Sequence, residues 1–289
     1  MTSRSDTEET ILVPVANAET AARQLDTAID IACDRSASIL LLFVLDVPSQ
    51  LSLADGRRYL LEDDDERMLE EAVHRVESQG VPVESRIRIA RGVATGIVGA
   101  VDEHDVDTIL LGWRGRPPRE DIILGNHLDR VLRSAECDVL VQRIKLPRPD
   151  VDRILVPVAG GPHSAFAAET AAAIARQNDA SVTLLHVHDE SDSDGTVEDA
   201  EALLEETRGQ VSDVASVETA LVESDAVTGT ITDWTTDHDV TVMGVSRGGL
   251  VQRKLLGTVS EAVGRHAAGS VILAKRYDPV PSRLRRLLP

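Results

Sequence analysis

The stretch Ile11-Leu-Val-Pro-Val-Ala16 recurs letter for letter as Ile154-Leu-Val-Pro-Val-Ala159, 143 positions further along the chain. An identical hexapeptide at that separation indicates a duplicated segment. Each run is apolar throughout, which is typical of a strand buried on both faces of a parallel sheet. The repeat therefore predicts two similar halves, each opening on a buried strand.

A glycine-rich loop repeats as well. Gly112-Trp-Arg-Gly115 is followed after nine residues by Gly125-Asn126, and Gly244-Val-Ser-Arg247-Gly248 is followed after eight residues by Gly257-Thr258. Both loops lie between an apolar run and a segment of helical period. Glycine lets a ligand approach the backbone, and the free N–H groups at a helix start suit a phosphate. The alternative, that these glycines only form tight turns, stays open.

Apolar runs alternate with helical periods along the first copy. Strands that are apolar throughout and separated by helices indicate a parallel sheet covered on both faces, a doubly wound α/β domain. We expect an irregular stretch at 48–58. The predicted strands are 11–16, 38–46, 83–90, 108–112 and 139–142, and the predicted helices are 18–35, 61–79, 95–104 and 126–134.

The length of 289 residues allows about two domains. We predict a first domain at 1–146, a second at 151–276 and a basic C-terminal tail at 277–289. Residues 144–150 contain two prolines and read as a short, stiff linker. For the tail, docking on a partner and fraying both stay open.

The formal net charge is −19, from 49 acidic and 30 basic residues, and lysine occurs only at 145, 254 and 275. Such a chain repels nucleic acid, so no nucleic-acid partner is expected. The composition resembles that of proteins from halophilic archaea. The acidic first ten residues do not read as a signal peptide, and a cytoplasmic protein is expected. Cys33 and Cys137 lack metal or redox spacing, and we expect both thiols to be buried.

The pattern Gly-x2-Gly-x9-Gly, together with Ile-Leu-Val-Pro-Val, resembles the universal stress protein (UspA) family, and both copies match along their full length. The resemblance implies a tandem of flavodoxin-like (adenine nucleotide alpha hydrolase-like) domains, each with a five-stranded parallel sheet. It also implies a site for ATP or another adenine nucleotide, with or without Mg²⁺. The first copy keeps the motif with Asn126 at the hydroxyl position. The second has Arg247 where the second glycine belongs.

Both copies depart from the family at one further position. Ala16 and Ala159 stand where ATP-binding members carry Asp directly after Val-Pro-Val. A site that lacks one hydrogen-bonding partner loses about 1–3 kcal/mol, or tenfold to a hundredfold in affinity. Weak or altered nucleotide binding is therefore the expectation for each copy.

Ligands of doubly wound sheets bind outside the carboxyl ends of the strands, where the strand order reverses. With the resemblance, this rule selects residues after the first, second and fourth strands of each copy. In the first copy they are Pro14, Val15, Ala16, Val44, Leu111, Gly112, Gly115, Gly125, Asn126 and His127. In the second they are Pro157, Val158, Ala159, Val187, Met243, Gly244, Arg247, Gly257, Thr258 and Val259.

Enzymatic chemistry is not expected, beyond slow incidental ATP hydrolysis. The histidines lack metal-binding spacings, and no phosphate-binding lysine loop or Ser-His-Asp order occurs. A nucleotide-binding stress-response module is the first hypothesis, and a ligand-poor interaction scaffold the second. Val-Pro-Val-Ala-Asn at 13–17 and Gly-Trp-Arg-Gly-Arg-Pro at 112–117 are similar to cytosolic stress-protein modules of haloarchaeal amino-acid permeases. That likeness implies a transporter as a partner. We also expect the last strands, 139–142 and 271–274, to pair as an intramolecular pseudo-dimer, and a homodimer is a further expectation.

Overall fold

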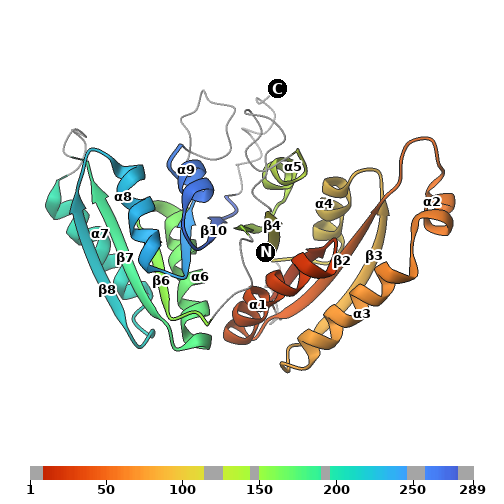
Figure 1. The fold of residues 1–289 in the computed structure, drawn as a ribbon, viewed down its shortest axis with the longest axis horizontal. Coiled ribbons are helices and arrows are strands. Elements are labelled where there is room, and N and C mark those ends of the chain that lie inside the picture. The colour runs from red at the N-terminus through yellow and green to blue at the C-terminus, as the bar shows by residue number, and fades with distance from the viewer. Residues whose placement is uncertain (1–8, 114–125, 144–149, 190–195, 246–257, 279–289) are drawn as a thin grey trace, which may run out of the picture.

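The computed structural model describes residues 9–113, 126–143, 150–189, 196–245 and 258–278 (Figure 1). The first half, in chain order, contains β1 (Thr10–Val15), α1 (Ala18–Arg35), β2 (Ser38–Asp46), α2 (Leu53–Leu60), α3 (Asp63–Glu77), β3 (Val83–Ala90), α4 (Val93–Glu103), β4 (Thr108–Trp113), α5 (Asn126–Ser134) and β5 (Asp138–Arg143). The second contains β6 (Arg153–Pro157), α6 (Gly161–Asn178), β7 (Ser181–His188), α7 (Val197–Gln210), β8 (Val217–Glu223), α8 (Val227–Trp234), the 3-10 turn η1 (Thr235–Asp237), β9 (Val240–Gly244), α9 (Thr258–His266) and β10 (Ser270–Lys275).

The ten strands form one sheet in the order β3-β2-β1-β4-β5-β10-β9-β6-β7-β8. Within each half every neighbouring pair is parallel. The strand order reverses between β1 and β4 in the first half and between β6 and β9 in the second. The predicted fold class, two doubly wound α/β domains with five parallel strands each, is confirmed.

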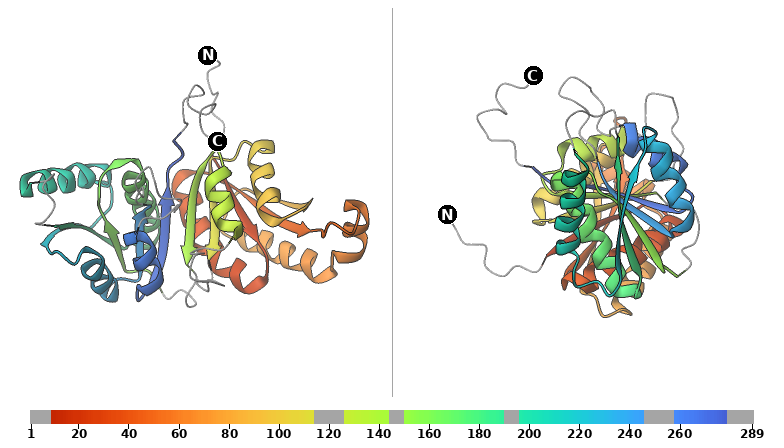
Figure 2. Two further views of the ribbon diagram at one scale, coloured as in Figure 1. Left: turned by 90° about the horizontal axis from the view of Figure 1, so that it is seen from above. Right: turned by 90° about the vertical axis from the view of Figure 1, so that its left-hand side faces the viewer.

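Helices cover both faces of the sheet (Figure 2). One hydrophobic core includes buried residues of α1, α3, α6 and α7, and the other includes residues of α4, α5, α8 and α9. The central strands are apolar because both of their faces are covered; Ile11, Leu12 and Val13 are all 0% exposed. The core therefore runs through both halves along the sheet.

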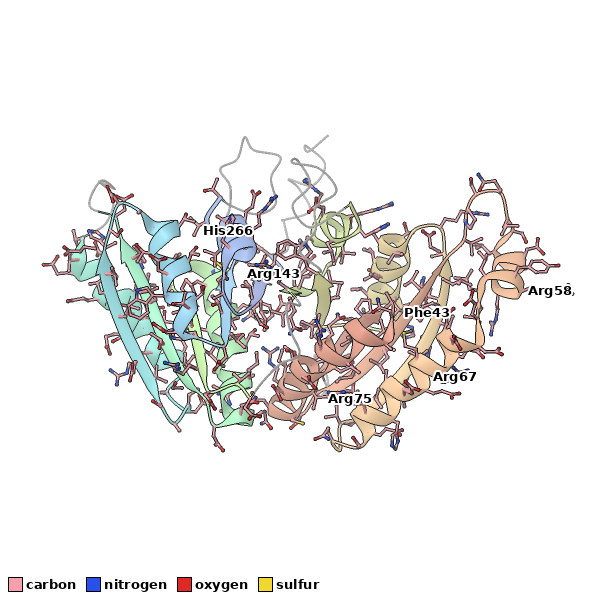
Figure 3. All side chains as sticks on the ribbon, viewed as in Figure 1. Phe43, Arg58, Arg67, Arg75, Arg143 and His266 are labelled. Atoms are coloured by element: carbon pink, nitrogen blue, oxygen red, sulfur yellow. The ribbon has the colours of Figure 1, made fainter. Side chains whose placement is uncertain are left out.

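The two halves meet where β5 pairs with β10, antiparallel, with Val141 opposite Leu273. The Arg143 guanidinium donates to the Gly264 carbonyl at 2.6 Å, and the Lys275 ammonium donates to the Leu132 carbonyl, also at 2.6 Å. These are equivalent positions of the two copies, so each half places a cation at the last turn of the other half's helix, where carbonyls lack helical partners. Figure 3 shows Arg143 between the halves. The predicted pairing of the last strands is confirmed.

Helices α1 and α6 form a second contact between the halves. The Arg176 guanidinium donates from Nε and Nη2 to the two carboxylate oxygens of Asp34, at 2.5 and 2.6 Å. Nearby, the Asn178 amide donates to Asp30 at 3.0 Å. The ring of Phe166, wholly buried, lies beneath the guanidinium groups of Arg35 and Arg276. Charge-assisted bonds and an aromatic anchor thus fix the two copies together.

The expectation of an irregular stretch at 48–58 is wrong, because α2 occupies Leu53–Leu60. Ser52 caps this helix: its hydroxyl accepts from the Asp55 N–H at 3.1 Å. Gly56 obscured the helical signal in the sequence. It is needed because a Cβ there would lie 2.3 Å from the Val47 side chain. The predicted helix at 61–79 begins two residues later, at α3.

The expectation that both cysteines are buried is wrong for Cys33. Cys137 is 4% exposed, whereas Cys33 lies exposed on α1. The side chains of Ala28 and Ala32 face the core from α1. Cys33 is the next residue after Ala32, and each step along a helix rotates the side chain by about 100°, so Cys33 points away from the core. The apolar surroundings in the sequence did not resolve that rotation.

Candidate functional site

The strands β1 and β4 of the first half separate toward their carboxyl ends, and we call this point of divergence the crevice. Their ladder contains only the pairs Ile11–Thr108 and Leu12–Ile109, although β1 continues beside β2 to Val15. By this register Val15 lies level with Gly112. The carboxyl ends of β1 and β4 therefore diverge at the strand-order reversal, which is where ligands of such sheets bind.

Pro14 explains why the ladder stops. The Thr10 carbonyl accepts from the Asp107 N–H at 3.1 Å, so Thr10 faces β4, and by strand alternation Pro14 also faces β4. Proline has no N–H to donate. In a continued ladder residue 14 would donate to the Leu110 carbonyl. The Gln24 side-chain amide donates to that carbonyl instead, at 2.6 Å, and Gln24 is 2% exposed.

The second half repeats the separation between β6 and β9. Their ladder also contains two pairs, Ile154–Val240 and Leu155–Thr241, and Pro157 takes the place of Pro14. The Ser164 hydroxyl accepts from the Ala159 N–H at 3.2 Å. One backbone donor at this crevice is therefore already satisfied by the protein, through a hydroxyl whose equivalent in the first copy is Ala21.

The mouth of the first crevice is formed by predicted residues with small or aliphatic side chains. Ala16 is exposed, and Pro14, Val44 and Gly112 are half-buried, whereas Val15 and Leu111 are buried beneath them. In the second half Ala159 and Thr258 are exposed. Val187, Gly244 and Val259 are half-buried, and Pro157, Val158 and Met243 are buried. Fewer of the strand-end residues are accessible in the second crevice.

Four predicted site residues, Gly115, Gly125, Arg247 and Gly257, lie outside the described residues, as does the side chain of Asn126. Helices α5 and α9 begin at 126 and 258, as predicted. His127 is exposed on α5. The site assignment of these residues stays a prediction.

Gly244 has a structural role in addition to its predicted one. A Cβ there would lie 2.6 Å from the His163 carbonyl carbon and 2.7 Å from the Ser164 nitrogen. The N-terminal turn of α6 therefore approaches β9 as closely as only glycine permits. Nearby, His163 Nδ1 accepts from the Arg276 N–H at 3.1 Å.

Sequence reasoning missed Gln24 and Ser164. Each is a polar residue of a helix, and each bonds to backbone at a crevice, Gln24 to β4 and Ser164 to Ala159 just after β6. A polar side chain in a stripe of apolar ones was the available signal, because a buried amide must find a hydrogen-bond partner.

Ionisable groups with shifted pKa values lie at the boundary between the halves. Burial raises the pKa of the Cys137 thiol to about 12. Burial lowers the pKa of Lys275, which the Cys137 and Asp138 side chains partly offset. Burial also lowers the pKa of Arg143. These shifts follow from desolvation and belong to the contact that joins the two copies.

The sequence pattern of the universal stress protein family matches residues 8–143 and 150–275. The chain belongs to the universal stress protein family. The two matched regions each contain one five-stranded half of the sheet. This protein is therefore a tandem universal stress protein, whose two copies form an intramolecular pseudo-dimer.

Universal stress protein MJ0531 of Methanocaldococcus jannaschii is 28% identical over 146 residues, which are 48% of this chain and 84% of that protein. A universal stress protein from Archaeoglobus fulgidus aligns with a TM-score of 0.67 at 19% identity, covering 93% of this chain and 97% of the other. The cytoplasmic domain of a prokaryotic cation chloride cotransporter aligns with a TM-score of 0.59 at 12% identity, covering 94% and 96%. At these identities the two structures show a shared fold alone.

In the described part of this universal stress protein, no helix is both long and apolar enough to cross a membrane. No cluster of three or more His, Cys, Asp or Glu side chains suited to a metal ion occurs within the same residues.

Proposed function

We propose that this tandem universal stress protein is a non-enzymatic module that binds an adenine nucleotide and acts as a stress-response regulator. The observation that carries the proposal is the crevice between β1 and β4. It opens at the carboxyl ends of the strands because Pro14 ends the ladder, and it recurs between β6 and β9. Each crevice adjoins the N-terminus of a helix, α5 or α9, whose positive dipole end suits a phosphate.

The nucleotide class is supported by the family. One matched structure is a universal stress protein in complex with cAMP, 21% identical to 46% of this chain with a TM-score of 0.36. That likeness is too low to transfer the ligand by itself. The support from this chain is the small and aliphatic mouth formed by Pro14, Ala16, Val44 and Gly112, which suits a flat purine ring.

Binding without chemistry is part of the proposal. Among the described strand-end residues at the first crevice, Pro14, Ala16, Val44 and Gly112 have no ionisable side chain, and general acid–base catalysis needs one within reach of the ligand. Contacts to backbone amides hold a nucleotide without activating it. Ala16, in place of the carboxylate of ATP-binding relatives, makes the expected affinity weak. Mg²⁺ would be held by phosphate oxygens rather than by this residue.

Thermal unfolding with ATP, AMP and cAMP tests the proposal. A nucleotide at one hundred times its dissociation constant adds about 2.7 kcal/mol to the free energy of unfolding. Ala16→Asp supplies one more hydrogen-bonding group and is expected to tighten binding about tenfold. Ala16→Asn is the matched uncharged control. Ala159→Asp and Ala159→Asn make the same comparison for the second crevice.

The glycine loops provide the reverse test. Gly125→Val is expected to abolish the shift that arises in the first copy, and Gly257→Val the shift that arises in the second. Equal responses of both variants and the parent protein would contradict the loop assignment. No shift with any of the three nucleotides would favour the alternative, an interaction scaffold or a soluble regulatory subunit of an amino-acid transporter.

A further inference from the structure

A cavity of about 730 Å³ lies in the second half, away from the nucleotide crevice. It is lined by the amino-terminal parts of β6, β7 and β8, by the end of α8 and by η1. The crevice lies at the opposite, carboxyl ends of these strands. Its volume is within the range of about 300–1,000 Å³ that small-molecule sites occupy. Figure 1 shows α8 beside α9, the helices that cover this face of the second half.

The first copy has no counterpart for two of the lining side chains. Thr183 and His238 line the cavity, and the equivalent positions in the first copy are Leu40 and Val106. Leu40 is 3% exposed and Val106 is 6% exposed, so both are packed core residues. The second copy has replaced an apolar pair by a hydroxyl and an imidazole, both half-buried.

The polar pair is fixed in one arrangement. His238 Nδ1 lies 2.7 Å from the Trp234 carbonyl oxygen, which only accepts, so Nδ1 carries the proton. Nε2 lies 3.1 Å from the Thr183 hydroxyl oxygen, within hydrogen-bond distance. The Trp234 indole stacks on the same imidazole, with ring centroids 6.3 Å apart. The indole of Trp234, the imidazole of His238 and the hydroxyl of Thr183 therefore lie side by side in the lining of the cavity.

Carboxylates dominate the charge of the cavity. Glu218 of β8, Asp233 of α8 and Asp237 of η1 line it, together with the guanidinium of Arg153. Within the described residues none of these three carboxylates has an ion pair. They do not converge, because no three acidic or histidine side chains of the described chain are grouped closely enough for a metal ion. Separate carboxylates suit several ammonium groups on one ligand better than a single ion.

We propose that this cavity binds an alkyl polyamine, a chain of methylene groups that carries several ammonium groups. Ammonium groups would pair with Glu218, Asp233 and Asp237. One of them would lie over the Trp234 ring, which attracts cations through its π face. The methylene segments would pack on Trp234 and on Ala220, the apolar side chain of the lining. The net charge of −19 raises the local concentration of such a cation.

Isothermal titration calorimetry with spermidine tests this site. The parent protein is expected to give saturable binding that equal charge supplied as MgCl2 does not reproduce. Glu218→Gln and Asp233→Asn are each expected to weaken binding about twofold to fivefold, the range for partly exposed ion pairs. Trp234→Leu is expected to weaken it about threefold to thirtyfold.

Glu84→Gln is the matched control for Glu218→Gln. Glu84 is the second residue of β3 and lies opposite Leu40, as Glu218 is the second residue of β8 and lies opposite Thr183. Glu84→Gln removes one exposed carboxylate, as Glu218→Gln does. It removes this charge from the first half, where the buried Leu40 and Val106 occupy the positions of Thr183 and His238. Spermidine affinity is expected to stay at the parent value in this variant.

The double variant Thr183→Leu with His238→Val gives the cavity the residues of the first copy and is expected to abolish saturable binding. Three results would overturn the proposal: no saturable heat with the parent, unchanged binding by a folded double variant, or equal weakening by Glu84→Gln and Glu218→Gln. The single surface variants keep the test decisive if the double variant does not fold. A nucleotide shift in the same samples reports on the crevice independently.

Discussion

Removing Arg176 is expected to loosen the contact between the two copies. Its guanidinium forms two parallel hydrogen bonds to Asp34, whose side chain is only 10% exposed, while that of Arg176 is 29% exposed. Arg176→Ala leaves the Asp34 carboxylate in a mostly buried place without its cation. A third bond, to Asp213 at 2.7 Å, is exposed and contributes little.

The magnitude follows from these exposures. Breaking a buried ion pair by removing one partner costs about 3–5 kcal/mol. Because nearly a third of the Arg176 side chain is in contact with water, we expect a loss of about 2–3 kcal/mol after discounting for solvent screening. For a chain of this size that corresponds to a fall in Tm of about 4–10 °C. Part of the loss should diminish at high salt.

A double-mutant cycle measures the pair directly. Denaturant unfolding of Arg176→Ala, Asp34→Asn and the double variant is expected to give a coupling free energy of about 1–3 kcal/mol. Arg208→Ala serves as the control, because its partner Glu205 is 66% exposed and the pair lies within one helix. A loss for Arg176→Ala no greater than that for Arg208→Ala, or a coupling near zero, would refute the reasoning.

The other expected outcomes concern two glycines and the two cysteines. Gly244→Ala is expected to lower the free energy of unfolding by more than about 1 kcal/mol, because its Cβ would meet the α6 backbone at 2.6 Å. Gly209→Ala, with nothing within 4 Å, is expected to raise it by about 0.5–1 kcal/mol in the same denaturant assay. In a thiol-reagent titration at pH 8, native protein is expected to react at Cys33 but not at Cys137, and denatured protein at both; rapid reaction of two native thiols would contradict the assigned burial. The Cys137 thiol stays protonated up to its pKa of about 12 when folded but ionises near 9.0 when unfolded. Its contribution to the free energy of unfolding should therefore fall by about 1.4 kcal/mol per pH unit between those values. The difference between parent and Cys137→Ala in pH-dependent unfolding checks this.

Local signals in the sequence failed where two segments far apart in the chain set the outcome. The sequence indicates an irregular stretch at 48–58, yet α2 occupies Leu53–Leu60, and its Gly56 packs against Val47 where a Cβ would lie 2.3 Å away. Cys33 reads as buried because its neighbours are apolar, yet the helix rotation exposes it. A hydrophobic pattern predicts the bounds of a helix and the direction of its side chains only to within a few residues, and it does not show which distant side chain a residue will contact.

The sequence predicted the position of the strand-order reversal, but only some of the residues that form the candidate site there. The strand-order rule located the crevices after the first, second and fourth strands. Whether a crevice opens depends on the divergence of β1 from β4, in which Gln24 satisfies the Leu110 carbonyl that Pro14 leaves without a donor. Such a bond joins residues 86 positions apart, and neither residue signals its partner.

By itself the sequence determined the duplication, the α/β class and, apart from α2, the order of strands and helices in the first copy, because those follow from local periodicity and from the repeated hexapeptide. The tertiary structure alone decided that Arg143 and Lys275 exchange places at the helix ends of opposite halves. It also decided that Thr183 and His238 line a cavity, whereas the equivalent residues of the first copy, Leu40 and Val106, are buried. The physical reason is that a side chain's chemistry is local, whereas its partner, its burial and its pKa depend on which distant segments the fold brings beside it.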